Sequence, residues 1–367
     1  MRPEVAGTRL LPCSWFRQEV AAACLAATLF ALPLRAQDVQ EKVQVDDLSR
    51  NFVVHLPKGY YSKQRYPVVI LLPGQNQQPD DMQRLTHFDQ FVADKNGIIA
   101  VYPNATRGRW NIGVRPEQTS TMAPHRGGGG HHGGYGGGGG GYPGGGGGYP
   151  GGGNSGGQNP DNNKSEPADD VAFLNQMLDQ IALKYSVDTS RIYATGLGDG
   201  GFMALRTGCA MADRVAAVAA VGAALPKTMI CLPSRPVPAL FISGTDDPIV
   251  PYGGGTYRPG QFHVLSAEDS AKTWARFDRC NEKPAQEKIQ SLQKGEKETN
   301  IFTFSGCHDN AQVALYAVKG GGNTWPGGQQ YMSEKEVGKT SNALNANETI
   351  WSFLATKKLA GDSGAGK

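Results

Sequence analysis

Short apolar runs alternate along the chain with stretches in which apolar residues recur at helical spacing. The runs have the length and the Gly or Pro borders of buried strands: 51–57, 66–74, 97–103, 191–196, 215–221, 238–244 and 313–320. The periodic stretches predict amphipathic helices over 80–95, 169–185, 200–215, 266–280 and 346–359. Strands that alternate with helices predict an α/β fold whose central sheet is mostly parallel and is covered on both faces.

One segment interrupts this alternation. Between Gly127 and Gly157, 22 of 31 residues are glycine, and "GGYPGGGGG" is echoed by "GGYPGGG". Such a composition buries too little apolar surface to offset the entropy of ordering the chain. We expect a disordered insertion over 125–167 inside one domain of residues 37–360, followed by a flexible tail, 361–367. Because the alternation resumes afterwards, the two ends of the insertion must lie close together.

The N-terminal 36 residues have the pattern of a secretory signal. Three arginines precede an apolar run, Val20 to Leu34, which is too short to span a bilayer comfortably, and Ala36 is a small residue at a cleavage point. A lipoprotein signal at Cys24 is disfavoured because "AAAC" lacks the large apolar residue that normally stands three positions earlier. We expect a secreted or periplasmic protein, with a membrane anchor as the alternative.

The composition of the mature chain excludes some partners. The formal charge of the 367-residue chain is +3, and it falls to +1 when the four arginines and two glutamates of 1–36 are removed. No basic cluster predicts nucleic-acid binding, and no second apolar run is long enough for a transmembrane helix. The sequence says nothing about the oligomeric state.

Four cysteines remain after the signal, an even number that predicts two disulfides in an exported chain. Three pairings are possible. We favour the sequence-local one, Cys209–Cys231 and Cys280–Cys307. Zinc is the alternative, but no Cys-x-x-Cys pair is present, and we expect neither a metal nor a cofactor.

The stretch "YATGLGDGGF", 193–202, has the layout of a nucleophile elbow, in which Gly-x-Ser-x-Gly joins a strand to a helix. The frame runs from Gly196 to Gly200, and its central position is Gly198 instead of a serine.

Several segments in order resemble the secreted polyhydroxybutyrate depolymerase and feruloyl esterase family of α/β-hydrolases. They are "LPGQNQ", "GIIAVYPNA", "RWN", "DDVAFL", "RIYATGLGDGGFMALR", "RPVPALFISGTDDPIVPYGGG", "WARFDRC" and "GGGNTWPGG". The resemblance covers nearly all of 45–356 apart from the insertion, and it implies an α/β-hydrolase fold. It places the triad serine at Gly198, the acid at Asp247 and the histidine at Asn323.

These substitutions remove the chemistry of a serine hydrolase. Glycine has no atom that attacks a carbonyl, and the asparagine amide is no base near neutral pH. Asp199 follows the elbow centre and is expected to point elsewhere, while Thr195 should lie in the strand. His263 and His308 lie outside the motif. We therefore expect no relocated nucleophile or base.

Other residues are placed at the pocket by their positions in the resemblance. Backbone N–H groups of Asp199 and of Gly74–Gln75 are candidates for an oxyanion site. The aromatic residues Trp110, Tyr252 and Trp325 are candidates for stacking on a ring, or for packing.

The sequence predicts an esterase-like protein without turnover whose pocket still binds an ester, polyester or polysaccharide ligand. Two alternatives stay open. One is an active carboxylic ester hydrolase with a relocated nucleophile. The other is a surface-adhesion protein that acts through the glycine-rich arm, where Tyr135, Tyr142 and Tyr149 recur every seven residues.

Overall fold

The computed structural model describes residues 36–114, 168–257, 262–291 and 293–359. Nearly all of the predicted signal, the insertion up to Pro167 and the tail lie outside these residues. The strands are β1 (Gln37–Val45), β2 (Leu48–Leu56), β3 (Tyr66–Leu72), β4 (Ile99–Pro103), β5 (Val187–Leu197), β6 (Ala217–Val221), β7 (Ala239–Gly244), β8 (Gly255–Tyr257), β9 (Phe262–Val264), β10 (Ala285–Ile289), β11 (Thr299–Phe304) and β12 (Val313–Val318).

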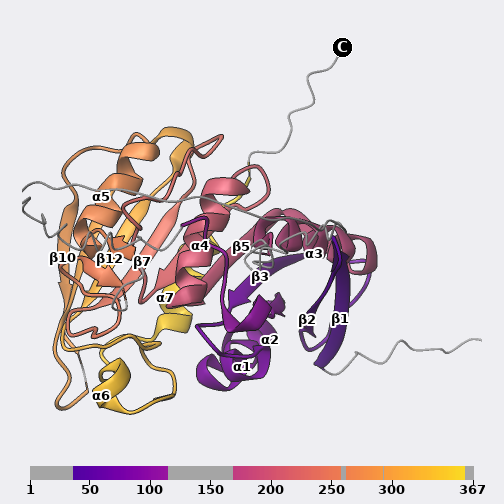
Figure 1. Cartoon of the computed structure of the whole chain (residues 1–367), viewed down its shortest axis with the longest axis horizontal. Coiled ribbons are helices and arrows are strands. Elements are labelled where there is room, and N and C mark those ends of the chain that lie inside the picture. The colour runs from indigo at the N-terminus through magenta and orange to yellow at the C-terminus, as the bar shows by residue number, and fades with distance from the viewer. Residues whose placement is uncertain (1–35, 115–167, 258–261, 292, 360–367) are drawn as a thin grey trace, which may run out of the picture.

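One large sheet forms the centre of the molecule (Figure 1). Its ten strands have the order β1-β2-β4-β3-β5-β6-β7-β12-β11-β10. The six from β4 to β12 pair in parallel, whereas β1 and β2 at one end and β11 and β10 at the other pair antiparallel. Strands β8 and β9 form a separate antiparallel pair. The expected α/β fold with a mostly parallel sheet is confirmed.

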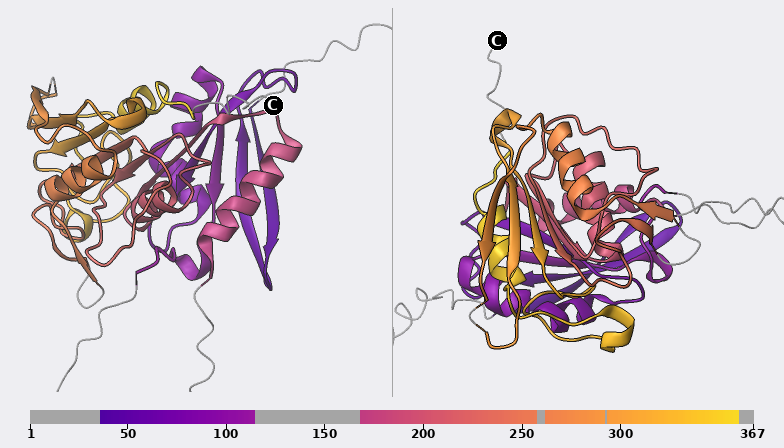
Figure 2. Two further views of the ribbon diagram at one scale, coloured as in Figure 1. Left: turned by 90° about the horizontal axis from the view of Figure 1, so that it is seen from above. Right: turned by 90° about the vertical axis from the view of Figure 1, so that its left-hand side faces the viewer.

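Helices cover both faces of the sheet, as the turned views in Figure 2 show. They are α1 (Pro79–Thr86), α2 (Asp94–Asn96), α3 (Asp170–Lys184), α4 (Asp199–Ala210), α5 (Ala267–Phe277), α6 (Glu334–Val337) and α7 (Ala346–Leu354). A π-helical turn, η1 (Asp89–Ala93), precedes α2, and short 3-10 turns occupy η2 (Thr106–Gly108) and η3 (His308–Asn310).

The strand β3 shows how the sequence builds two cores. Its side chains point alternately to the two faces of the sheet. Val68, Ile70 and Leu72 join one buried cluster, which includes residues of α3, α4 and α5. Val69 and Leu71 join the other, which includes residues of α1 and α7. All seven residues of β3 are buried, which explains why the central strands appear as continuous apolar runs.

The edges of the sheet were not predicted. Strand β1 (QDVQEKVQV) keeps most of its side chains exposed or half-buried, and all five residues of β10 are exposed. An edge strand that faces water on its outer side needs few apolar residues. Their sequences therefore lack the apolar run that marks a buried strand.

The prediction of one helix over 80–95 was wrong. Helix α1 ends at Thr86, because His87 has a left-handed conformation with φ of 48°, and the chain continues through η1 into α2. Met82, Leu85, Phe88 and Val92 nevertheless all belong to the same buried cluster. The apolar spacing was sufficient for burial on one face but did not reveal the change of helical axis.

The residues that flank the segment 115–167 contact each other directly. The backbone N–H of Asn111 donates to the Asp170 carboxylate at 2.6 Å, and the Asn111 side chain donates to the Ala168 carbonyl at 3.0 Å. Arg50 of β2 holds the other Asp170 oxygen at 2.6 Å, and both charged side chains are buried. The two sides of the insertion are therefore close in space, as the sequence required, and strands from both sides belong to one sheet.

Both expected disulfides are present. Cys209 of α4 is bonded to Cys231, and Cys280, just after α5, is bonded to Cys307. They close loops with sequence separations of 22 and 27 residues, so each stabilises the fold by restricting the unfolded chain.

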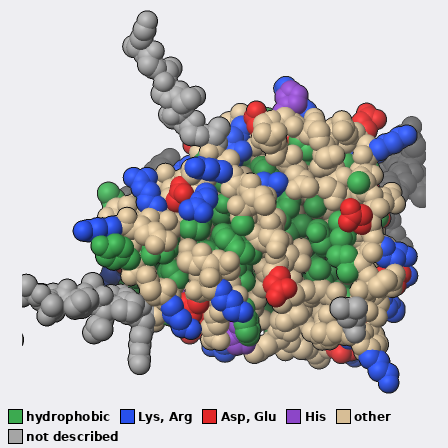
Figure 3. All heavy atoms as spheres, turned by 180° about the vertical axis from the view of Figure 1, so that it is seen from behind, with side chains coloured by type: hydrophobic (Ala, Val, Ile, Leu, Met, Phe, Trp, Pro, Cys, Tyr) green, Lys and Arg blue, Asp and Glu red, His purple; other side chains and the backbone are tan. Residues whose placement is uncertain are grey.

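The surface behind the view of Figure 1 carries its charges in a scattered pattern. In Figure 3, hydrophobic side chains gather in the middle of this face, and lysine and arginine side chains lie singly or in small groups, many of them toward its margins. None of the described helices is long and apolar enough to cross a membrane.

We expect Asp170→Ala to lower the free energy of unfolding by about 3–5 kcal/mol, because it leaves the Arg50 guanidinium buried without its partner. Urea unfolding measures the change. Asp179→Ala is the control: Asp179 pairs with Arg214 on the surface and should cost no more than about 1 kcal/mol. Equal small losses in both variants would contradict a structural role for the Arg50–Asp170 pair.

Candidate functional site

Gly198 lies at the sharp turn between β5 and α4, at the carboxyl end of a central strand. Its φ of 55° and ψ of −117° are sparsely populated by residues with a side chain, and this is the strained geometry of a nucleophile elbow. Glycine adopts it without steric cost. A Cβ atom placed on Gly198 would have only the Asn323 Oδ1 within 4 Å, at 3.1 Å, so a side chain here needs only a small shift of the Asn323 amide.

The flanking glycines are required by close packing of the turn. A Cβ on Gly200 would lie 1.9 Å from the Leu72 carbonyl oxygen, and a Cβ on Gly196 would lie 2.5 Å from the Gly200 carbonyl carbon. Both distances are far shorter than a van der Waals contact. The turn can therefore press against the end of β3 only when these positions have no side chain.

Asn323 and Asp247 meet beside Gly198. The Asn323 Nδ2 donates to Asp247 Oδ2 at 2.8 Å and to the Gly222 carbonyl at 2.9 Å. Two acceptors on this side of the amide fix its orientation and leave Oδ1 facing the position above Gly198. The three positions that the resemblance pairs with a catalytic triad are therefore adjacent in space.

Asp247 is held by the backbone and by burial. Its Oδ1 accepts the N–H groups of Ile249 and Val250, both at 2.8 Å. Burial raises the pKa of Asp247 to about 6, although these hydrogen bonds and the one from Asn323 favour the charged form. The desolvation of the carboxylate outweighs its hydrogen bonds.

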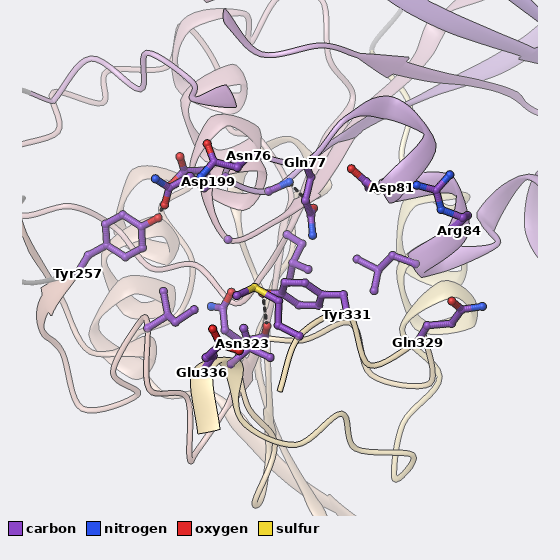
Figure 4. Close-up of a pocket in the computed structure, with 18 residues that line it drawn as sticks. Asn76, Gln77, Asp81, Arg84, Asp199, Tyr257, Asn323, Gln329, Tyr331 and Glu336 are labelled. Carbon is purple, nitrogen blue, oxygen red and sulfur yellow. Dashed lines mark hydrogen bonds and ion pairs between the residues drawn. The ribbon is translucent and has the colours of Figure 1, made fainter. Parts of the chain in front are cut away.

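A cavity of about 680 Å³ opens over Gly198. Its walls combine the loop after β3, the start of α4, helix α1 and the segment 329–337. In Figure 4, Asp199 and Tyr257 meet at one end, and Asp81, Arg84 and Gln329 lie at the other. Asn323 and Glu336 lie close together below Tyr331.

Asp199 lines this cavity, so the expectation that its side chain points elsewhere was wrong. The Tyr257 hydroxyl donates to Asp199 Oδ1, and the Arg109 Nε lies 3.4 Å from Asp199 Oδ2. Only 5% of Asp199 is exposed. The carboxylate is held in place by a phenol and a guanidinium from two other parts of the chain.

The candidate oxyanion donors differ in whether their N–H groups already have a hydrogen-bond acceptor. Gly74, Gln75 and Asp199 all line the cavity. The Gly74 N–H already donates to the Gln77 Oε1 at 2.7 Å, so it is not available to a ligand in this conformation. The N–H groups of Gln75 and Asp199 have no hydrogen-bond partner among the described residues.

The three aromatic residues expected at the pocket do not line it. Trp110 is buried and donates to the Pro73 carbonyl, and Trp325 is fully buried and donates to Asn347. The Tyr252 hydroxyl donates to Glu268. They hold the loops behind the cavity together, which is the packing role that the sequence left open.

No alternative hydroxyl or thiol nucleophile of the serine, threonine or cysteine type lines the cavity within the described residues. Thr195 is buried in β5, as expected. His263 is on β9 beside Thr256, and His308 begins η3, and neither lines the cavity.

Most lining residues were not predicted from the sequence, among them Tyr257, Tyr331 and Glu336. The Tyr331 hydroxyl donates to the Asn323 carbonyl at 3.0 Å and braces the segment that carries Asn323. These residues come from loops and short elements with no local motif, so only the folded chain brings them to the site.

No family model matches the chain. It is 29% identical over 205 residues to a putative esterase, NocK, of Nocardia uniformis subsp. tsuyamanensis, covering 53% of this chain and 60% of that protein. It is 33% identical over 163 residues to feruloyl esterase B of Piromyces equi, covering 42% and 29%. The chain thus spans less than two thirds of the length of these curated relatives.

Solved structures with a similar arrangement include an acetyl xylan esterase from Aspergillus awamori, with 13% identity, a TM-score of 0.47 and coverage of 78% of this chain and 94% of that one. Another is a ferulic acid esterase of the fungus Anaeromyces mucronatus, with 16% identity, a TM-score of 0.45 and coverage of 90% and 93%.

We expect the contribution of Asp247 to the stability of the protein to decrease as pH rises from about 4 to about 6. In this window the folded Asp247 keeps a proton that the unfolded chain releases, so ionisation favours unfolding by up to about 3 kcal/mol. Asp247→Asn should remove this contribution, so that the free energy of unfolding falls less over this window than in the native chain, as measured by urea unfolding. In the control Asp179→Asn, at an exposed carboxylate, the profile should keep its slope. An unchanged slope in Asp247→Asn would contradict the raised pKa.

We expect Gly200→Ala to destabilise the protein by about 3 kcal/mol or more, because its Cβ would overlap the backbone of β3. Gly253→Ala is the matched control, since no atom lies within 4 Å of the Cβ position there, and it should change the free energy of unfolding by no more than about 0.5 kcal/mol. Thermal unfolding compares the two. A Gly200→Ala protein as stable as the control would show that the turn does not need the close approach.

Proposed function

We propose that this chain, an esterase-like protein of the α/β-hydrolase fold similar to feruloyl and acetylxylan esterases, binds an ester ligand but does not hydrolyse it through a serine mechanism. The observation that carries the proposal is the Asn323–Asp247 hydrogen bond of 2.8 Å beside Gly198. An acid, an amide and a glycine occupy the places where a hydrolase would need an acid, a base and a nucleophile.

Each part of the missing chemistry follows from these residues. Nucleophilic attack on a carbonyl needs a hydroxyl or thiol at the elbow, and Gly198 supplies none. A base must take the proton of that hydroxyl, and the Asn323 Oδ1 accepts hydrogen bonds but does not accept a proton near neutral pH. Asp247 therefore orients an amide that cannot act as a base.

The binding part of the site is retained. The cavity stays open above the elbow, and the N–H groups of Gln75 and Asp199 are available for a carbonyl oxygen. In serine hydrolases that lose the triad, such donors and substrate binding leave only about a thousand-fold rate over water. We therefore expect ligand binding with very little turnover.

The relatives guide the choice of ligand. The similar proteins are described as feruloyl esterases, acetylxylan esterase/xylanase and a putative esterase, so a feruloyl or acetyl ester on a polysaccharide is the first ligand to test. A polyester ligand remains a prediction from the sequence resemblance. The two disulfides support the expectation that the protein is exported to an oxidising compartment.

The decisive experiment measures hydrolysis of p-nitrophenyl acetate and butyrate by the native chain and by the Gly198→Ser/Asn323→His double variant. We expect no turnover above background from the native chain and recovery in the double variant. The single variants should stay near background, because either group alone is ineffective and the loss of one costs about a million-fold in turnover.

Robust turnover by the native chain would overturn the proposal. Asp199 would then be the first residue to test, because it is the carboxylate nearest the elbow in sequence and its Oδ2 lies in the site without a hydrogen-bond donor. Turnover that disappears in Asp199→Asn would support the relocated-nucleophile alternative.

A further inference from the structure

The emptied centre of the cavity presents a specific set of hydrogen-bonding groups. Asn323 is 2% exposed, and its Oδ1 has no hydrogen-bond partner among the described residues, although its Nδ2 has two. The oxygen borders the cavity and is not one of the sealed, unpaired side-chain atoms, so a ligand N–H can reach it and gain one hydrogen bond. The serine side chain that would have filled the adjacent space is absent, which lets a ligand approach this oxygen.

Two backbone donors come from residues that line the same cavity. The backbone N–H groups of Gln75 and Asp199 belong to residues that line the cavity, and neither is used within the described residues. The second of them lies at the N-terminus of α4, a helix of twelve residues, where the helix dipole adds a partial positive charge. A carbonyl oxygen fits these donors.

The charges around the centre oppose an anion. The lining holds the carboxylates of Asp81, Asp199 and Glu336 and one arginine, Arg84, which is paired with Asp81 at 2.6 Å. The Arg109 Nε lies 3.4 Å from Asp199 Oδ2. The Asp199 carboxylate therefore places a negative charge in the lining close to the N–H donors, which opposes a bound carboxylate.

We propose that the cavity prefers an uncharged carboxamide, that it binds the corresponding ester less tightly and the free carboxylate least, and that Asp199 is the residue that excludes the carboxylate. This inference rests on the proposed function, because it assumes that the cavity above Gly198 binds acyl ligands. It adds the chemical class of ligand, an uncharged carboxamide, that glycine at 198 and asparagine at 323 favour.

The order follows from matching donors to acceptors. A carboxamide places its carbonyl oxygen on the N–H groups of Gln75 and Asp199 and donates its own N–H to the Asn323 Oδ1. An ester makes the first contact but leaves the Asn323 oxygen without a donor. A carboxylate also lacks the donor, and it brings a negative charge close to Asp199 and to the Asn323 oxygen.

The test measures the affinities of ferulamide, methyl ferulate and ferulate for the native chain at pH 7 by calorimetric titration. The amide should bind about fivefold more tightly than the ester, the contribution of one hydrogen bond. Ferulate should bind about tenfold more weakly than the ester, because one repulsive charge is added in a partly desolvated site.

Two variants separate the effect of the Asp199 charge from the effect of losing a carboxylate elsewhere on the protein. Asp199→Asn removes one negative charge from the cavity lining and should strengthen ferulate binding about tenfold while changing ferulamide binding less than about threefold. Asp179→Asn makes the same chemical change on the far exposed face of α3, outside the cavity, and should change none of the three affinities. Circular dichroism and thermal unfolding of both variants establish that they are folded before the titrations are compared.

Each outcome has a defined meaning. The order amide, ester, carboxylate together with the gain in Asp199→Asn supports the inference. Equal affinities for the three ligands, or tighter binding of ferulate by the native chain, overturns it and leaves the proposed binding function standing. Failure of all three ligands to bind at millimolar concentration overturns the inference and also the proposal that the cavity binds acyl ligands. If Asp199→Asn does not fold, Asp199→Glu takes its place: it keeps the charge and should keep ferulate the weakest ligand, and a loss of that discrimination would overturn the role of Asp199.

Discussion

The close approach of the β5–α4 turn to the end of β3 is the constraint on which the site depends. The turn passes so near the Leu72 carbonyl that Gly200 has no room for a Cβ, and Gly198 takes a conformation that glycine adopts without strain. This turn sets the start of α4, the direction of the Asp199 N–H and the floor of the cavity. The loop after β3 approaches the turn equally closely, since a Cβ on Gly74 would lie 3.2 Å from the Leu197 carbonyl oxygen.

Around this turn, Gly198, Asn323 and Asp247 supply an acid and an amide but no hydroxyl nucleophile and no imidazole base. Asn323 makes with Asp247 the hydrogen bond that a histidine ring N–H would make, and it gains a second bond to the Gly222 carbonyl. The Asn323 amide is therefore held by its surroundings, and both N–H groups of its Nδ2 have an acceptor. The amide presents an acceptor to the cavity, and an acceptor selects ligands by hydrogen bonding without providing a base.

Charge adds a second level of selection. Asp199, Tyr257 and Arg109 come from the start of α4, from β8 and from the loop after β4, and they converge at one end of the cavity. Because the carboxylate neutralises the guanidinium, the N–H donors at the elbow act in a locally neutral or negative field. The same loop after β4 carries Asn111, which joins the two sides of the insertion through Asp170, so the frame of the pocket and the closure of the insertion share one segment.

The sequence by itself determined the α/β class, the central strands, both disulfides and the identity of the residues at the elbow and at positions 247 and 323, because buried strands, cysteines and motif glycines carry local signals. It did not reveal β1 and β10, whose edge positions need few apolar residues, their half-buried neighbour β11, or the break at His87. It placed Trp110, Tyr252 and Trp325 at a pocket that they do not line, since their neighbours are decided by loop packing. Only the tertiary structure brought Tyr257 and Arg109 to Asp199 and turned the Asn323 oxygen toward Gly198, because those contacts join segments far apart in the chain and depend on how the loops fold over the sheet.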